Sequence, residues 1–289
     1  MDTPSHRHAV GLLLLAALAW SLGGVLIKAA DWPPLAIAGG RGLVATVFLV
    51  LVRGRRLRFT WSPIQIGAAV AYAGCTVLFA AATKRTTAAN AILLQYTAPA
   101  WVALLGAWFL REKVRPLDWL AIGAVFAGLA AFLYDGLRMH DVLGIAVAVA
   151  SGVCFAAMVV LLRGQKDGSP LESIVLGNLL AFLIGLPAML GASRPSTETT
   201  IALLLLGVVQ LGVPYLLYAR AIRTVTALEA VLIPVIEPIL NPVWVKLRFG
   251  ERPSRTAVIG GLVVLAAVSL RAVASFRRDA GGIKPPTAV

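Results

Sequence analysis

The sequence predicts an all-α membrane protein in which ten transmembrane helices form two inverted five-helix repeats. Hydrophobic residues make up 59% of the 289-residue chain and charged residues 13%, whereas a typical soluble domain has about 25% charged residues. Ten apolar runs follow one another along the chain, and most of them approach the roughly 20 residues that a spanning helix needs. The second half of the chain also resembles the first half.

The ten apolar runs are separated by short gaps, so no soluble domain interrupts them. The first run is long enough to span, and we expect an uncleaved helix there rather than a signal peptide. Any function must therefore reside in the helix bundle. The runs cover residues 9–30, 34–52, 64–82, 87–109, 117–133, 141–162, 171–190, 200–220, 226–245 and 256–274.

Lysine and arginine are unevenly distributed between the two sets of loops. If the N-terminus is cytoplasmic, the inner loops and tails hold 16 of them and the outer loops hold 8, while Lys28 and Arg41 lie within runs. This bias follows the positive-inside rule, and an even number of spans returns the C-terminus to the cytoplasm. Membrane topology thus explains the formal charge of +13, and nucleic acid is not an expected partner.

The internal repeat is clearest where residues 78–99 align with residues 217–238. Eight of the aligned pairs are identical, and they include Pro99 with Pro238. Because each half then carries five spans, an odd number, the second half is expected to enter the membrane inverted relative to the first. The predicted units are residues 1–138 and 139–275, followed by a cytoplasmic tail of residues 276–289.

Three prolines in the ninth run stand four positions apart, in the sequence IPVIEPILNP. Each proline leaves the carbonyl four positions earlier without its usual donor, and such an oxygen in hydrocarbon needs water, a polar side chain or a ligand. Interrupted helices at corresponding places of inverted repeats indicate a substrate site near the membrane centre. The alternative is a kink packed against neighbouring helices. The predicted helix-break and gating residues are Pro99, Pro234, Pro238 and Pro242.

Glu237 and Asn241 each precede one of these prolines. A carboxylate in mid-membrane costs about 2.5–3.5 kcal/mol on insertion scales, so it indicates a functional site. Glu237 could accept the ammonium group of an amino acid, exchange a proton, or be neutral and silent. Aromatic and polar residues of other runs complete the candidate site, with helix packing as the alternative for each. The predicted substrate-binding residues are Trp20, Tyr72, Phe79, Gln95, Tyr96, Trp101, Gln210, Tyr215, Tyr218, Glu237 and Asn241.

Residues with catalytic or metal-binding chemistry are scarce in the runs. The three histidines lie in a tail and a short loop, without Cys or carboxylate partners at ligand spacing. Cys75 and Cys154 sit within runs, where a thiol usually acts as a small apolar filler. An intramembrane enzyme is disfavoured, and no catalytic residue, metal or cofactor is expected. Anionic substrates would call for clustered Lys and Arg at the midplane, which the chain lacks.

Several short motifs occur in a characteristic order. They are ALAWSLGG at residues 17–24, Arg41 in the second run, the Thr-Ala-Ala start and central proline of the fourth run, and the pairs RE and GE at residues 111–112 and 250–251. Together they resemble the drug/metabolite transporter superfamily in its EamA-type, ten-helix branch. The resemblance covers nearly the whole chain and is greatest to bacterial inner-membrane exporters of aromatic and other neutral amino acids. It implies a basket-like bundle that alternates between inward-open and outward-open shapes.

The expected function is therefore secondary export of neutral amino acids and their analogues, favouring aromatic or hydrophobic ones, across a bacterial inner membrane. An exporter of drugs or cationic metabolites on the same scaffold is the alternative, and it would depend strictly on Glu237. The expected partners are a small-molecule substrate and the lipid bilayer, and the sequence is compatible with a monomer. Proton-coupled and downhill transport both remain open.

Overall fold

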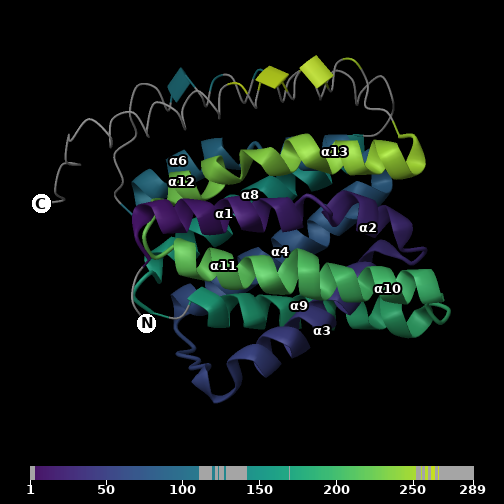
Figure 1. Cartoon of the computed structure of the whole chain (residues 1–289), viewed down its shortest axis with the longest axis horizontal. Coiled ribbons are helices and arrows are strands. Elements are labelled where there is room, and N and C mark those ends of the chain that lie inside the picture. The colour runs from purple at the N-terminus through teal and green to yellow at the C-terminus, as the bar shows by residue number, and fades with distance from the viewer. Residues whose placement is uncertain are drawn as a thin grey trace, which may run out of the picture.

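The computed structural model describes residues 4–110, 142–168 and 170–251, together with positions 119, 120, 123, 127, 255, 258, 259, 262, 263 and 266. These residues contain eight helical segments long and apolar enough to cross a membrane, and no strand. The predicted all-helical membrane protein is confirmed (Figure 1). The eight segments correspond to the first four and the sixth to ninth predicted runs, and each keeps the number of its run. The segment Ala88–Phe109 is thus the fourth and Ala227–Phe249 is the ninth. The fifth run (117–133), the tenth (256–274) and the tail (276–289) lie outside the described residues, apart from those single positions.

Four of the eight segments are continuous and four are interrupted. The continuous ones are α3 (Pro34–Arg53) with the short turn η1 (Gly54–Arg56), α4 (Pro63–Arg85), α8 (Val142–Gly164) and α9 (Pro170–Gly191). The interrupted ones are α1 (His6–Trp20) with α2 (Gly23–Ala29), α5 (Ala88–Gln95) with α6 (Ala98–Phe109), α10 (Thr197–Leu205) with η2 (Leu206–Gly212) and α11 (Val213–Ala221), and α12 (Ala227–Leu232) with η3 (Ile233–Val235) and α13 (Ile236–Phe249).

The fourth and ninth segments begin in the same way. The hydroxyl of Thr87 accepts a hydrogen bond from the backbone N–H of Asn90 at 3.1 Å, and that of Thr226 accepts one from Glu229 at 3.2 Å. Each threonine thus satisfies a donor at the start of its helix that has no partner within the helix. The two threonines are aligned with each other in the sequence repeat, so the repeat extends to local structure.

The same two segments are also interrupted at corresponding places. α5 ends at Gln95, and α6 begins at Ala98 with Pro99 in its first turn. In the ninth segment the interruption is a 3₁₀ turn in which Pro234 has the non-helical ψ of 15°. Gln95 and Pro234 are again aligned in the sequence repeat.

The two interrupted segments lie side by side and run in opposite directions. α12, which begins the ninth segment, packs against α6, which ends the fourth, and α13 packs against α5. In Figure 1, α12 and α6 accordingly lie at the same end of the bundle. This antiparallel packing places the two interruptions next to each other in the interior of the bundle.

Glycines allow the continuous helices to approach closely. A Cβ added to Gly185 of α9 would lie 2.3 Å from the carbonyl oxygen of Leu35 and 2.6 Å from the Cα of Gly39, both in α3. A Cβ added to Gly177 would lie 2.7 Å from the ring of Tyr72 in α4. Small residues at such contacts are typical of packed membrane helices, and here they hold α3, α4 and α9 together beside the cavity described below.

At one end of the bundle, contacts join segments that the predicted topology places on the outer side. Lys28 Nζ lies 3.0 Å from the Glu251 carboxylate and donates to the carbonyl oxygen of Thr86 at 3.0 Å. Trp32 Nε1 donates to the carbonyl oxygen of Ser193 at 2.9 Å. These contacts connect the ends of the first, third, seventh and ninth segments.

At the other end, a second set of contacts joins segments predicted to lie on the inner side. His6 Nε2 lies 3.2 Å from Glu229 Oε1, and the hydroxyl of Thr224 donates to the carbonyl oxygen of Pro4 at 3.0 Å. The first contact joins the start of the first segment to α12, and the second joins it to the loop before α12. The loops are thus sorted between the two ends as alternating spans require.

Candidate functional site

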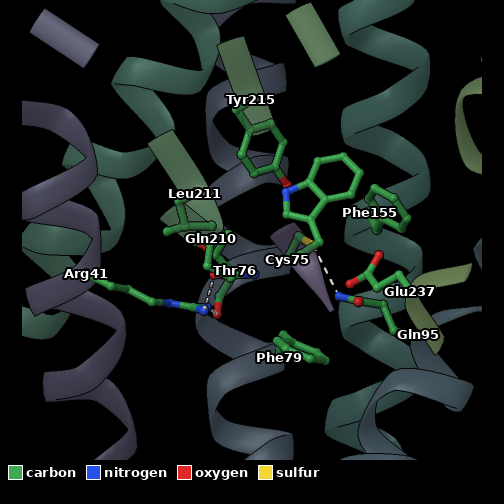
Figure 2. A pocket seen from close by; sticks show the side chains of 11 residues that line it. Arg41, Cys75, Thr76, Phe79, Gln95, Phe155, Gln210, Leu211, Tyr215 and Glu237 are labelled. Carbon is green, nitrogen blue, oxygen red and sulfur yellow. Dashed lines mark hydrogen bonds between the residues drawn. The ribbon is translucent and has the colours of Figure 1, made fainter. Parts of the chain in front are cut away.

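A cavity lies in the interior of the bundle where the interrupted segments meet (Figure 2). Trp20 is the last residue of α1, Gln95 ends α5, Gln210 lies in the π-helical turn η2, and Glu237 is the second residue of α13. Each of the four interrupted segments therefore borders the cavity at its interruption. The lining residues are Trp20, Arg41, Cys75, Thr76, Phe79, Gln95, Phe155, Gln210, Leu211, Tyr215 and Glu237.

There is a physical reason why the interruptions lie at the cavity. A helix break leaves backbone N–H and C=O groups without partners, and within a membrane these are tolerated only where protein covers them or a polar cavity receives them. Single π-helical turns inside α-helices are likewise frequent at functional sites. The interruptions of this chain thus add polar backbone groups to a region that also contains polar side chains.

Glu237 is the acidic side chain of the cavity, and it is 8% exposed. The hydroxyl of Tyr96 lies 3.0 Å from Glu237 Oε2 and 2.9 Å from the carbonyl oxygen of Pro234, and it can donate to one of them at a time. The Pro234 carbonyl is the one that Pro238 deprives of a backbone donor. Tyr96, at the first interruption, therefore stabilises the second.

Gln95 connects three helices on the same side of the cavity. Its Nε2 donates to Ser151 Oγ at 2.8 Å, and the Ser151 hydroxyl donates to the carbonyl oxygen of Cys75 at 2.9 Å. α8 also approaches the first interruption closely, because a Cβ added to Gly152 would lie 2.9 Å from the carbonyl oxygen of Gln95. That carbonyl is the one left without a helical donor by Pro99. Figure 2 shows Gln95 beside the Glu237 carboxylate.

Arg41, from the middle of α3, lies on the opposite side of the cavity from Glu237 (Figure 2). Its side chain is 1% exposed. One guanidinium nitrogen donates to the carbonyl oxygen of Thr76 and another to Gln210 Oε1 at 3.4 Å. A guanidinium group and a carboxyl group thus face the same cavity from opposite sides.

Aromatic rings line much of the remaining wall and also pack behind it. The centroid of the Trp20 ring lies 5.1 Å from that of Tyr215 and 5.4 Å from that of Tyr218, and the Tyr72 ring lies 4.8 Å from Tyr215. These distances are typical of favourable aromatic contacts. Among the described residues, neither Trp20 Nε1 nor the Tyr218 hydroxyl has a hydrogen-bond partner.

The structure brings six of the eleven predicted binding residues to the cavity surface: Trp20, Phe79, Gln95, Gln210, Tyr215 and Glu237. Tyr72, Tyr96 and Tyr218 lie behind this lining and contact it through the rings and hydroxyl described above. Trp101 and Asn241 are outside the lining. The Trp101 indole N–H lies 3.3 Å from the Thr97 hydroxyl oxygen, whereas Asn241 is fully buried and its Oδ1 would meet a Cβ at Gly24.

The four predicted prolines have different local roles. Pro99 lies in the first turn of α6 and Pro238 in the first turn of α13, where a missing N–H is tolerated. Pro234 lies in η3, and Pro242 lies inside α13. Whether any of them takes part in gating stays a prediction.

Five lining residues were absent from the predicted binding set: Arg41, Cys75, Thr76, Phe155 and Leu211. Arg41 carried a usable signal, because a charged residue inside a span usually faces a cavity or a partner. Cys75 and Thr76 share one face of α4 with Phe79, which was recognisable from helical spacing. Phe155 and Leu211 are ordinary apolar residues, and nothing in their sequence context separates them from residues of the packed core.

Metal-binding chemistry has no candidate location in the part of the chain that the structure describes. Within it, no group of three or more His, Cys, Asp and Glu side chains could hold a metal ion. The polar groups of the cavity instead include amide, hydroxyl, carboxylate and guanidinium groups that can hydrogen-bond a small solute.

A membrane helix bundle with a polar and aromatic cavity at its interrupted helices has the architecture of a small-molecule transporter. The chain belongs to the EamA-like transporter family, whose profile matches residues 7–134 and again residues 142–272. The family domain thus occurs twice. The identification places the chain among transporters rather than enzymes, and it supports the resemblance to the drug/metabolite transporter superfamily.

Characterised and uncharacterised relatives are similar over much of their length. An uncharacterised transporter of Archaeoglobus fulgidus is 25% identical over 93% of this chain and 98% of its own. The pseudopaline exporter CntI of Pseudomonas aeruginosa is 27% identical, over 91% of this chain and 96% of its own. The threonine/homoserine exporter RhtA of Escherichia coli is 28% identical, over 61% of this chain and 60% of its own.

A protein of known crystal structure has the same fold. It is 18% identical in sequence and superimposes with a TM-score of 0.67, over 94% of this chain and 98% of the other. At this identity the similarity concerns the fold alone.

Proposed function

We propose that this protein is a secondary transporter that exports neutral amino acids and their analogues, favouring aromatic or hydrophobic ones, by alternating access. The observation that carries the proposal is the Glu237 carboxylate in a cavity that also has an aromatic wall. A carboxylate suits the ammonium group of an amino acid, and rings such as Trp20 and Tyr215 suit an apolar side chain. The relative named as a threonine/homoserine exporter supports amino acids as the substrate class.

The size of the cavity favours a mechanism in which the helices move. The volume open to the centres of water molecules is about 40 Å³, and one water needs about 10–15 Å³ by this measure. The cavity therefore has room for a few water molecules, and an aromatic amino acid requires it to widen. The interruptions at Pro99 and Pro234 are suitable places for bending, because fewer helical hydrogen bonds oppose it there.

The proposed architecture is ten transmembrane helices in two inverted repeats, residues 1–138 and 139–275. The opposite directions of the fourth and ninth segments support the inversion, since these segments correspond in the sequence repeat. The two matches to the family profile support the duplication. We place the protein in a bacterial inner membrane with both termini in the cytoplasm, on the basis of the distribution of Lys and Arg.

Export of drugs or cationic metabolites is the less favoured alternative. Glu237 and the aromatic wall would suit a lipophilic cation. Arg41, however, faces the same cavity and is almost completely buried. Its positive charge would repel a bound cation in surroundings of low dielectric constant, whereas a neutral amino acid carries no net charge.

The direct test is flux from proteoliposomes loaded with labelled phenylalanine, leucine or threonine, with and without a pH gradient. We expect protein-dependent efflux that is faster for phenylalanine and leucine. The Glu237→Gln variant should reduce phenylalanine efflux by about 10-fold or more, since a hydrogen bond to a charged group contributes about 1.5–3 kcal/mol.

Glu198→Gln is a matched control, because this carboxylate is 63% exposed and lies outside the cavity. It should leave efflux unchanged. Equal efflux from wild type and Glu237→Gln, with and without the pH gradient, would exclude a role for Glu237 in binding and coupling. Absence of protein-dependent flux for every amino acid tested would overturn the proposed function.

A further inference from the structure

The proposed function leaves the buried guanidinium of Arg41 without a role. This side chain lies in the wall of the cavity, 1% exposed, between the carbonyl oxygen of Thr76 and the side-chain amide of Gln210. Both acceptors are neutral. Across the described residues, no carboxylate forms an ion pair with Arg41, and its Nε has no hydrogen-bond partner.

Lys28 and Lys84, two other basic residues of the spanning helices, are placed differently. Lys28 is paired with Glu251 at 3.0 Å, and Lys84 donates to the carbonyl oxygen of Ala30. Both lysines lie near a helix end, whereas Arg41 lies well inside α3 and faces the cavity. A buried charge without a counter-ion is strongly unfavourable, and within a membrane it usually marks a binding pathway.

Glu237 presents a carboxyl group on the opposite side of the cavity (Figure 2). It is 8% exposed, its Oε2 is hydrogen-bonded to Tyr96, and among the described residues its Oε1 accepts no hydrogen bond. No ion pair joins it to Arg41. The guanidinium and the carboxyl group are therefore held apart, and neither forms an ion pair within the described part of the protein.

A solute with one carboxylate and one ammonium group would satisfy both groups at once. The planar guanidinium binds a carboxylate with two parallel hydrogen bonds, and a carboxylate such as Glu237 binds an ammonium group. Because a zwitterion has no net charge, its binding would leave the total charge of the cavity unchanged while each buried charge gains a partner.

We propose that Arg41 binds the carboxylate of a zwitterionic amino acid whose ammonium group is bound by Glu237. The inference rests on the proposed function and specifies how the same cavity selects its substrate. Thr76 and Gln210 position the guanidinium, and the aromatic wall contacts the apolar side chain of the substrate. Solutes that carry only one of the two charges should bind less well than the zwitterion.

The first experiment uses the wild-type protein and a series of matched inhibitors. Efflux of labelled phenylalanine from proteoliposomes is measured in the presence of phenylalanine, phenylalaninamide or 3-phenylpropionate, at about pH 6, below the ordinary pKa of an α-amino group. The amide lacks the carboxylate and the propionate lacks the ammonium group. We expect each to inhibit about 10- to 100-fold more weakly than phenylalanine, because each loses one hydrogen-bonded ion pair.

The second experiment locates the carboxylate site with Arg41→Met and Arg41→Lys. In Arg41→Met, inhibition by phenylalanine should be about 10- to 100-fold weaker than in the wild type, whereas inhibition by phenylalaninamide should change little. The preference for phenylalanine over the amide should therefore disappear. Arg41→Lys should retain part of the preference, because it keeps the charge but not the planar fork. Arg55→Met is the control, because Arg55 is an exposed residue of η1. This variant should keep the wild-type preference for phenylalanine over phenylalaninamide.

If Arg41 has a purely structural role, inhibition by all three compounds should weaken by the same factor in both variants, and this result would overturn the inference. So would equal inhibition of the wild type by phenylalanine and phenylalaninamide, a measurement that needs no variant to fold. In either case phenylalanine efflux by the wild type would leave the proposed function standing. If the wild type transports no amino acid, the proposed function fails, and the inference fails with it.

Discussion

Tyr96 is the side chain that links the two interruptions. Its hydroxyl lies within hydrogen-bond distance of the Pro234 carbonyl and of the Glu237 carboxylate, both in the ninth segment, while its own backbone forms the end of α5. Pro238 removes the donor that the Pro234 carbonyl would have in a regular helix. One phenol group can thus replace the missing backbone hydrogen bond of Pro234 or donate to the acidic side chain of the cavity, one at a time.

Replacing Tyr96 with Phe should therefore destabilise the protein. The substitution leaves a buried carbonyl and a buried carboxylate oxygen without this donor, at a cost of about 1–3 kcal/mol. Thermal unfolding in detergent is the measurement, and we expect a lower midpoint together with slower phenylalanine efflux.

Tyr218→Phe is the matched control for this prediction. Tyr218 is equally buried, but within the described residues its hydroxyl has no hydrogen-bond partner, so removal of the oxygen should leave the unfolding midpoint nearly unchanged. Equal midpoints for Tyr96→Phe and wild type would show that the hydroxyl does not support the second interruption.

At the scale of helices, three of the four interruptions have a proline in or directly after them, and one does not. The fourth and ninth segments contain prolines in corresponding places, and proline has a definite effect on a helix. The first segment ends α1 at Trp20 and restarts at Gly23, and the eighth contains the π-helical turn around Gln210. The first has no proline at its break, whereas Pro214 follows the π-helical turn in the first turn of α11, as Pro99 does in α6. At the break of the first segment, Gly23 closely approaches the Gln210 side chain, a tertiary contact that the sequence does not show.

The contact between α3 and α9 supports a prediction at this scale. Gly185→Ala should destabilise the bundle, since the new methyl group would lie 2.3 Å from a backbone oxygen of α3 and forced overpacking costs about 1–3 kcal/mol. Gly191→Ala, in the same helix, is the control because nothing lies within 4 Å of the added Cβ.

The midpoint of thermal unfolding distinguishes the two variants. We expect a clear decrease for Gly185→Ala and no decrease for Gly191→Ala. If both variants unfold at the wild-type temperature, α3 and α9 can separate without penalty, and the close contact between them is not needed for stability.

For the molecule as a whole, side-chain contacts join the spans at both ends of the bundle. The pair of Lys28 and Glu251 lies at one end, and the pair of His6 and Glu229 lies at the other. An alternating-access protein must release one end while it keeps the other closed. The proposed outer end therefore depends on an ion pair that a single substitution can remove.

Glu251→Gln should favour the shape that is open at that end. A partly exposed ion pair contributes roughly 0.5–1 kcal/mol, which corresponds to a shift of about two- to fivefold in population. Cys75 lines the cavity and can report this opening in a Cys154→Ala background. We expect a membrane-impermeant maleimide added on the outer side to label Cys75 faster by this factor, and phenylalanine to slow the labelling.

Glu198→Gln serves as the control, because both side chains of the Glu198–Arg248 pair are exposed and exposed ion pairs contribute little to stability. Its labelling rate should equal that of the parent protein. An unchanged rate for Glu251→Gln would mean that Lys28 and Glu251 do not keep the outer end closed.

The sequence alone determined the class of protein and the eight described spans, and it predicted the chemically distinctive residues of the candidate site. Long apolar runs in a bilayer have to form helices, so composition and length sufficed for the membrane fold. Glu237 and the prolines were identifiable because charge and helix breaks are costly in hydrocarbon and therefore rare. The inverted arrangement and the division into residues 1–138 and 139–275 stay predictions from the repeat.

Only the tertiary structure decided which side chains share the cavity. Arg41, Thr76 and Gln210 come from three separate spans, and their proximity depends on the close contacts of α3 and on the π-helical turn. Asn241, one turn of helix beyond Glu237, instead faces Gly24. Helical spacing shows which residues share a face, but the rotation of each helix about its own axis is set by packing against its neighbours. That rotation determines whether a face meets the cavity or another helix.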